Sequence, residues 1–160
     1  MSEILEPLLL QTCSAPYVAG VLQSPGQSLT PLVIKMPLGF VCRVVRGEHC
    51  KTKGGLLEEM AQELEFPGYF GGNWDALDEC LGDLEWLRAK GLVFIFTDAH
   101  ELLCEAAGDY RIFIEILEAA GAYWANAQPE GIPFHALLAV PQALRQARAD
   151  WRVPLLNLSA

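Results

Sequence analysis

The stretch FPGYFGGNWDALDECLGDLEW, residues 66–86, organises the central part of this chain. It opens as a glycine-rich turn and becomes a predicted helix at Asn73, a residue type that caps helix N-termini well. The apolar residues of this helix recur at i, i+3, i+4 and i+7 and so form a single stripe: Leu77, Cys80, Leu81 and Leu84. The pattern predicts a helix that packs one face against a core and turns the other face outward.

The opposite face of the predicted helix is acidic and carries Asp75, Asp78, Glu79 and Asp83. The pairs Asp75/Glu79 and Glu79/Asp83 place like charges at i, i+4, and each pair costs about 0.2–0.5 kcal/mol. Residues 56–86 hold nine acidic residues and no Lys or Arg, whereas the other 11 acidic residues are balanced by 11 Lys and Arg. We interpret this face as a surface suited to a cation-rich partner.

The bulk composition limits the classes of function. A chain of 160 residues with 52% hydrophobic residues is expected to form one domain with a sizeable core. Its net charge of −9 argues against nucleic acid or an anionic membrane as a direct ligand. Five scattered cysteines without a CxxC pair, and no recognisable leader or membrane span, predict a reduced, cytoplasmic protein.

Strands and helices alternate from residue 39 onward. Residues 40–45, 92–96 and 134–140 read as strands, and the last two are continuous apolar runs typical of strands buried on both faces. Helices are predicted over residues 52–64, from Asn73 onward and over 110–126, the last with Tyr123 among its apolar residues. This alternation predicts an α/β fold with parallel strands.

The two ends of the chain are predicted as extensions of a domain that spans residues 39–141. In residues 1–38, the runs 17–22 and 32–36 are expected to be short edge strands, paired as a hairpin, because prolines confine them to edges or ends. Residues 142–160 are expected to form a short basic helix that packs on the domain through Leu144, Ala147 and Trp151.

The residues that usually carry catalysis form no recognisable constellation. The three histidines (His49, His100 and His135) match no metal-binding spacing, and His135 is expected to be a satisfied core residue. The chain has no GxSxG motif, and its glycine-rich turn matches no phosphate-binding loop. We therefore expect a protein that is not an enzyme, with no catalytic residue, cofactor or metal. A metal-dependent hydrolase that uses Asp75, Asp78 and Glu79 remains an alternative.

Aromatic residues lie on both sides of the acidic residues in the sequence. Tyr69, Phe70, Trp74 and Trp86 are of the kind that anchors protein interfaces. Phe70 and Trp74 fit a place in the core equally well, and the sequence leaves the two readings open.

The run FPGYFGGNWDALDECL closely resembles the barstar family of small cytoplasmic ribonuclease inhibitors, and the likeness extends over about residues 39–141. The resemblance implies a three-stranded parallel sheet flanked by helices. It also implies that the loop and helix plug a ribonuclease active site, with carboxylates where the RNA phosphates would lie. The residues that would face the partner are Tyr69, Gly71, Asn73, Trp74, Asp75, Asp78, Glu79 and Glu118.

Two of these positions depart from the family pattern. Glu79 stands where the family has an aspartate, and Asp78 replaces an aromatic residue. The leading hypothesis is an inhibitor or immunity protein that binds a basic secreted ribonuclease or nuclease toxin. The alternative is an interaction module of the same fold with another kind of partner. A monomer is favoured, although the terminal extensions could cover the sheet edge or recruit a second copy.

Overall fold

The two continuous apolar runs form neighbouring strands at the centre of the molecule, β4 (Gly91–Thr97) and β5 (Phe134–Pro141). A computed structural model describes residues 3–68 and 70–158. Almost every residue of both strands is buried, so the prediction of strands covered on two faces is confirmed. Side chains of a strand alternate between its faces, and the two strands therefore contribute to a core on each side of the sheet.

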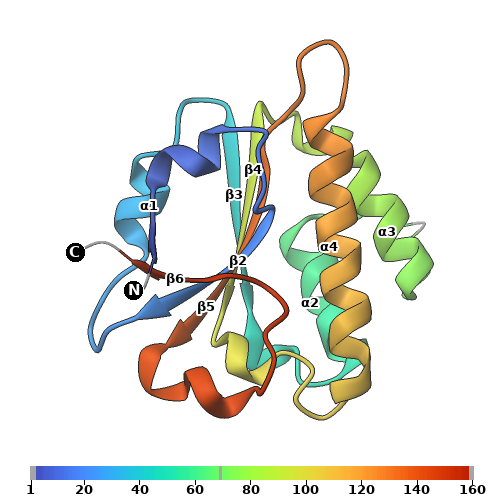
Figure 1. Cartoon of the computed structure of the whole chain (residues 1–160). Coiled ribbons are helices and arrows are strands. Elements are labelled where there is room, and N and C mark those ends of the chain that lie inside the picture. The colour runs from blue at the N-terminus through green and yellow to red at the C-terminus, as the bar shows by residue number, and fades with distance from the viewer. Residues whose placement is uncertain (1–2, 69, 159–160) are drawn as a thin grey trace.

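The sheet has six strands rather than the three expected. Its order is β1-β6-β2-β5-β4-β3, and every paired register is parallel (Figure 1). The remaining strands are β1 (Glu3–Leu5), β2 (Val18–Gln23), β3 (Phe40–Arg46) and β6 (Leu155–Leu158). Three of the six come from the two ends of the chain, which lie beyond the part that resembles the barstar family.

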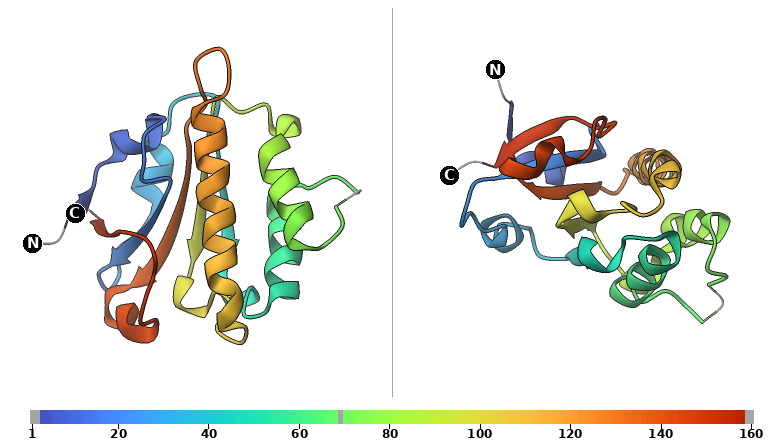
Figure 2. Two further views of the ribbon diagram at one scale, coloured as in Figure 1. Left: turned by 45° about the vertical axis from the view of Figure 1, so that its right-hand side comes forward. Right: turned by 90° about the horizontal axis from the view of Figure 1, so that it is seen from below.

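Helices cover both faces of the sheet. One face carries α2 (Lys53–Glu63), α3 (Trp74–Asp83) and α4 (Tyr110–Ala125), and the other carries α1 (Thr30–Ile34) and the 3-10 helix η1 (Pro7–Gln11) (Figures 1 and 2). Shorter 3-10 helices lie in the connections: η2 (Gly47–His49), η3 (Glu85–Leu87), η4 (Ala99–Glu101), η5 (Ala107–Asp109) and η6 (Gln142–Ala147). The three helices predicted in the central part are confirmed within a few residues.

The N-terminal segment does not form the expected hairpin of edge strands. The run at 17–22 becomes β2, an interior strand between β5 and β6, because Pro16 precedes the strand and interrupts none of its hydrogen bonds. The run at 32–36 falls largely in α1, where Pro31 occupies the first turn, a position at which proline favours a helix start.

The C-terminal segment differs from the predicted basic helix. It forms η6 and then the strand β6, and Leu144 and Ala147 are exposed instead of packed. Trp151 is buried, and its backbone carbonyl accepts a hydrogen bond of 2.8 Å from the Tyr110 hydroxyl. Burial raises the pKa of Tyr110 to about 12, so this hydroxyl keeps its proton and donates. The tail is therefore anchored by aromatic residues and by strand pairing.

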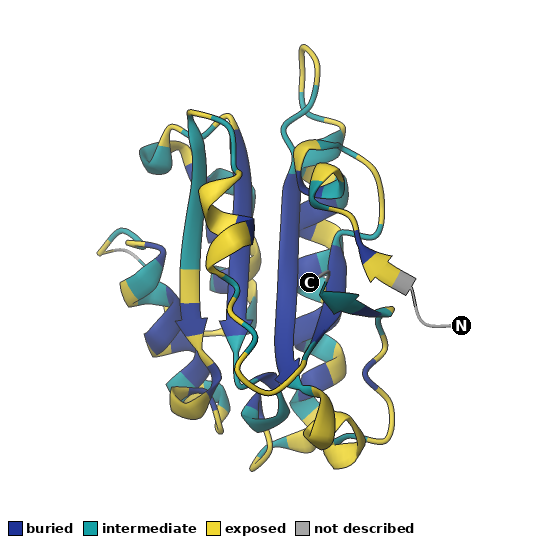
Figure 3. Ribbon diagram, turned by 90° about the vertical axis from the view of Figure 1, so that its left-hand side faces the viewer, coloured by how far each residue is buried: buried dark blue, intermediate teal, exposed yellow. Residues whose placement is uncertain are grey.

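Burial follows the layers of the fold. The central strands β4 and β5 are buried along nearly their whole length. By contrast, α1 and β3, which lie on one side of the molecule, carry exposed residues (Figure 3). Within residues 3–68 and 70–158, no helix is long and apolar enough to cross a membrane.

Candidate functional site

The glycine-rich turn leads into α3 through a capped helix start. Gly71 and Gly72 are exposed, and Gly72 has a φ of 69°, a left-handed conformation that glycine adopts without strain. The Asn73 side chain accepts a hydrogen bond of 2.8 Å from the backbone N–H of Ala76, which confirms Asn73 as the N-cap. Tyr69, a predicted partner-facing residue, lies outside the described residues.

The two faces of α3 are as predicted except at Asp83, which was expected on the exposed acidic face and is half-buried. Leu77, Cys80 and Leu81 are buried, and Asp75, Asp78 and Glu79 are exposed. Burial raises the pKa of the Cys80 thiol, and the charges of Asp83 and Glu79 raise it further. Within the described part of the chain, no ion pair or hydrogen bond reaches the side chain of Asp75, Asp78 or Glu79. Three neighbouring carboxylates therefore face solvent without an ion pair to any described residue.

A groove runs between α3 and α4 beside these carboxylates. Its volume is about 390 Å³, and its lining combines two acidic side chains, small residues and one tyrosine: Asp78, Glu79, Gly82, Ala119, Ala120 and Tyr123. The space between the two helices stays open because Gly82, Ala119 and Ala120 have no side chain or a short one. Tyr123 is 58% exposed and forms the aromatic wall. The groove can receive an extended side chain, with carboxylates at its rim.

The walls of the groove are held in place by hydrogen bonding and packing. The indole Nε1 of Trp124 in α4 donates to the backbone carbonyl of Leu81 in α3 at 2.7 Å. On the inner side, the Trp74 ring packs on Phe113 with 6.4 Å between centroids. The relative position of the two helices is thus set by the half-buried Trp74 and Trp124 and the buried Phe113, none of which lines the groove.

Three of the four predicted aromatic anchors, Phe70, Trp74 and Trp86, pack against the hydrophobic core. Trp74 is half-buried against Phe113, with the Lys53 ammonium 5.2 Å from the centre of its ring. Phe66 packs on Phe70 at 4.9 Å and on Trp86 at 6.3 Å between ring centroids. Phe70 and Trp74 therefore pack against the core, which was one of the two interpretations that the sequence left open.

Tyr123 lines the groove, although the apolar pattern of its helix predicted a place on the apolar side. Helical periodicity could have indicated this position. Tyr123 lies ten residues after the buried Phe113, which corresponds to about 1,000° of rotation and places the two side chains roughly 80° apart around the helix axis. Its position relative to the acidic helix is set by the packing of α4 on α3.

Glu118 does not line the groove. It precedes Ala119 on α4 and, three residues before Gly121, shares a stripe with it. A Cβ atom built at Gly121 would lie 2.3 Å from the Tyr17 side chain, so this stripe faces the N-terminal segment. Glu118 is half-buried, and desolvation raises the pKa of its carboxyl group. Glu118 is thus not among the residues that line the groove beside Asp78 and Glu79.

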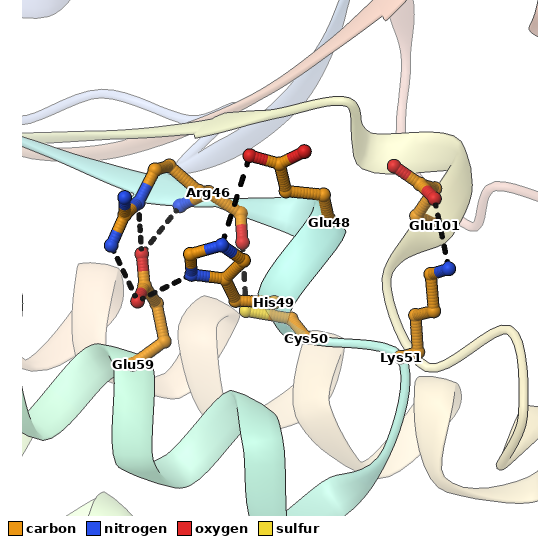
Figure 4. Close-up of polar contacts among 7 residues, drawn as sticks. All are labelled: Arg46, Glu48, His49, Cys50, Lys51, Glu59 and Glu101. Atoms are coloured by element: carbon orange, nitrogen blue, oxygen red, sulfur yellow. Dashed lines mark hydrogen bonds and ion pairs between the residues drawn. The ribbon is translucent and has the colours of Figure 1, made fainter.

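A second polar cluster surrounds Glu59 at the end of β3 (Figure 4). Glu59 is only 3% exposed and accepts hydrogen bonds from the Arg46 backbone N–H and Nε at 3.0 Å, and from Arg46 Nη2 and His49 Nδ1 at 3.3 Å. Burial alone would raise the pKa of Glu59, but the hydrogen bonds from Arg46 and His49 outweigh it and lower the pKa. Both carboxylate oxygens are engaged, so Glu59 joins α2 to the end of the strand.

A metal site at Asp75, Asp78 and Glu79 was the alternative that the sequence left open. Among residues 3–68 and 70–158, no three or more His, Cys, Asp or Glu side chains are placed to share a metal ion. A cavity of about 230 Å³ beside Glu59 is lined by His49, Gly55, Glu58, Glu59 and Gln62.

His135 is a buried core residue, as the sequence indicated, and both of its ring nitrogens face backbone carbonyl oxygens. It is 1% exposed in β5, with Nδ1 at 3.0 Å from the Pro16 carbonyl oxygen and Nε2 at 2.8 Å from that of Thr12. Burial lowers the pKa of the imidazole, and the two backbone contacts oppose that shift. His135 thereby ties the N-terminal segment to the central sheet.

Comparisons with known proteins agree with this arrangement at two levels. A family model described as Barstar (barnase inhibitor) matches residues 40–139, the part that contains the acidic helix and the groove. The fold is similar to the ORC2 protein of Aeropyrum pernix in its ADP form, with a TM-score of 0.58 and 11% identity. That likeness covers 95% of this chain and 44% of the other, and at this identity it concerns the fold alone. A search of curated proteins found no match.

Proposed function

Since the chain belongs to the barstar family, we propose that it is a protein inhibitor of a basic ribonuclease or other nuclease toxin. In this proposal the exposed face of α3 and the adjoining groove bind the nuclease and occlude its active site. The protein would need no cofactor or metal and would not itself be an enzyme. Its contact would be with the nuclease, with no direct binding of nucleic acid.

The observation that carries the proposal is the unpaired set of carboxylates on α3. Asp75, Asp78 and Glu79 are exposed, and no cation among the described residues offsets them. The active site of a ribonuclease presents cationic side chains to phosphate, and a carboxylate cluster can occupy the same positions. The repulsion within α3 would then be relieved when the partner supplies positive charge.

The groove suggests how one contact would be made specific. An arginine or lysine side chain of the nuclease would lie in the space above Gly82, Ala119 and Ala120, and its charged end would meet Asp78 or Glu79. Tyr123 would cover the aliphatic part or stack on a guanidinium group. In this arrangement Asp78, which replaces an aromatic residue of the family pattern, adds a charge where the groove itself supplies the aromatic wall.

The place of action proposed is the cytoplasm, as the sequence analysis expected. All five cysteines are free, which suits a reducing compartment. An inhibitor that binds a nuclease there protects cellular RNA from either a self-produced enzyme or a toxin that enters.

The test uses the purified chain and the candidate nuclease encoded beside its gene, assayed by inhibition of RNA cleavage and by calorimetry. Asp75→Ala and Glu79→Ala are each expected to weaken binding at least about tenfold, since they remove charges that meet cations in the complex. Glu58→Ala is the matched control, because Glu58 is an exposed, unpaired acid of α2. Association should slow as salt is added. The Glu58→Ala substitution should leave the binding affinity nearly unchanged.

A variant that fills the groove separates shape from charge. Ala119→Leu keeps every carboxylate but occupies the space beside Tyr123, and it should weaken inhibition without changing the salt dependence of association. If the α3 variants bind a confirmed nuclease as tightly as the original chain, the site assignment is wrong. A non-nuclease that binds through the same carboxylates would instead support the alternative of a general interaction module.

A further inference from the structure

The two edges of the sheet differ in how well they are protected. At one end β1 has three residues within the described part of the chain, and short edge strands offer little for another strand to pair with. At the other end β3 has seven residues, FVCRVVR, without a proline, and its two arginines are held in ion pairs by Glu65 and Glu59 of the same chain. The terminal extensions thus lengthen the sheet beyond β5 and leave the β3 edge uncovered.

Hydrogen bonds at the ends of β3 show which of its backbone groups point away from β4. The Phe40 N–H donates to the Pro37 carbonyl at 3.1 Å, and the Arg46 N–H donates to Glu59 at 3.0 Å. Successive residues of a strand turn their amides to opposite sides, so the even-numbered residues 40–46 turn theirs outward. Between the closed ends, the outward groups of Cys42 and Val44 have no partner from a turn, loop or side chain in the part of the chain that the structure describes.

An exposed apolar surface lies next to these groups. Val44 is 41% exposed on the face of β3 beneath α1, and Val33 of α1 is 40% exposed and lines the same cavity as Val44. Ile34 at the end of α1 and Leu38 before β3 are 75% and 97% exposed. Figure 3 shows β3 and α1 together on the side of the molecule where exposed residues interrupt the buried sheet. The unpaired edge of β3 and the exposed apolar surface therefore lie next to each other.

We propose that β3 pairs with β3 of a second copy of this chain, antiparallel about a twofold axis at Cys42. In this register the Cys42 N–H of each copy donates to the Cys42 carbonyl of the other. The Val44 N–H of each copy donates to the Phe40 carbonyl of the other. The pairing uses the outward groups that the closed ends leave available, and it joins the two sheets into one continuous sheet.

The charge of Arg43 favours this register over the one shifted by a single residue. An axis at Arg43 would place the two Arg43 side chains directly opposite each other, and like charges opposite each other destabilise a strand pair. With the axis at Cys42, Arg43 lies opposite Val41 of the second copy and keeps its own ion pair with Glu65 at 3.0 Å. Phe40 then faces Val44 of the second copy, so the apolar side chains of β3 meet across the axis.

The proposed dimer does not depend on the proposed inhibitor function. The carboxylates of α3 and the groove lie outside the pairing strand, so each copy would keep its own acidic face. Loss of dimerisation and loss of nuclease binding are therefore separate results of separate variants.

The first test is sedimentation of the full chain over a wide concentration range. The expected result is a concentration-dependent dimer that Val44→Lys weakens at least about tenfold, because the lysine would lie opposite Phe40 at a pairing edge. Leu144→Lys is the matched control, since Leu144 is 40% exposed on η6, away from β3, and it should leave the dimer intact. A chain that stays monomeric throughout, or a dimer that both variants weaken equally, overturns the proposal.

The second test needs no change at β3 and so holds even if Val44→Lys fails to fold. In a chain with Cys13→Ala and Cys104→Ala, Cys42 is the cysteine that is neither buried nor replaced. Mild oxidation should crosslink two copies through Cys42, because directly opposed residues in an antiparallel pair lie within disulfide reach. A dimer that gives no Cys42 crosslink would rule out this register.

Discussion

Two acidic residues in and just after α2, Glu59 and Glu65, lie in the same window of the sequence as the acids of α3 but have a different environment. In α2 and just beyond it, Glu59 is bound by Arg46 and Glu65 by Arg43, each at 3.0 Å. In α3, Asp75, Asp78 and Glu79 are exposed and have no ion pair among the described residues. The cations that neutralise the first set come from β3, which precedes the acidic window in the chain.

This difference shows which part of the acidity is structural. The carboxylate of Glu59 is nearly inaccessible and holds the end of β3 to α2, so it contributes to the fold. Asp75, Asp78 and Glu79 form no ion pair with any described residue, and the like charges along α3 repel one another, so in the free protein they weaken the fold. A charge count from the sequence treats both sets alike, and the tertiary contacts divide them.

The largest expected effect tests the structural side of this comparison. Glu59→Ala should lower the free energy of unfolding by about 2–3 kcal/mol, because it leaves the Arg46 backbone N–H unpaired and opens space beneath it. Urea unfolding measures the loss. Glu58→Ala, one position away on the exposed side of α2, should change stability by less than about 0.5 kcal/mol. Equal effects of the two substitutions would contradict the assigned role of Glu59.

The second prediction concerns acid pH. The pKa of Glu59 in the folded protein lies below its ordinary value of 4.5, so its ionised form is favoured by folding. Its stabilisation is therefore present above pH 4.5 and is lost as the pH falls through the lowered pKa. The stability difference between the original chain and Glu59→Gln should shrink over that interval. A difference that stays constant from neutral pH to well below 4.5 would exclude this linkage.

The smallest effect has the opposite sign and tests the α3 side. Glu79→Gln should raise the free energy of unfolding by about 0.2–0.5 kcal/mol for each repulsive i, i+4 pair that it removes. Added salt should reduce this gain, because the charges are exposed to solvent. Glu58→Gln has no acidic residue at i±3 or i±4, so it should give no comparable gain. If Glu79→Gln destabilises the free protein, its carboxylate has a structural role after all.

The local pattern predicted most of the central fold. Strands at residues 40–45, 92–96 and 134–140 and the start of α3 at Asn73 follow from apolar periodicity and from a capping side chain, which act within a few residues. The exposure of the α3 carboxylates followed from the same periodicity. These predictions succeed because the chain's own nearest neighbours determine them.

Predictions that depended on distant partners were less accurate. β2 was expected at an edge, but pairing with β5 and β6 encloses it, and a short apolar run carries no information about its neighbours. The same limit applies to the candidate site. Trp74 packs inward on Phe113, and Tyr123 reaches the groove from another helix.

By itself the sequence determined the parallel α/β core, the acidic face of α3 and the likeness to the barstar family, since these depend on residue order and spacing. Only the tertiary structure decided that the sheet has six strands, that β3 supplies cations to Glu59 and Glu65, and that a groove lies beside Asp78 and Glu79. The physical reason is that charge and periodicity are local properties of the chain. Strand pairing, ion pairing and grooves join segments that the sequence keeps apart.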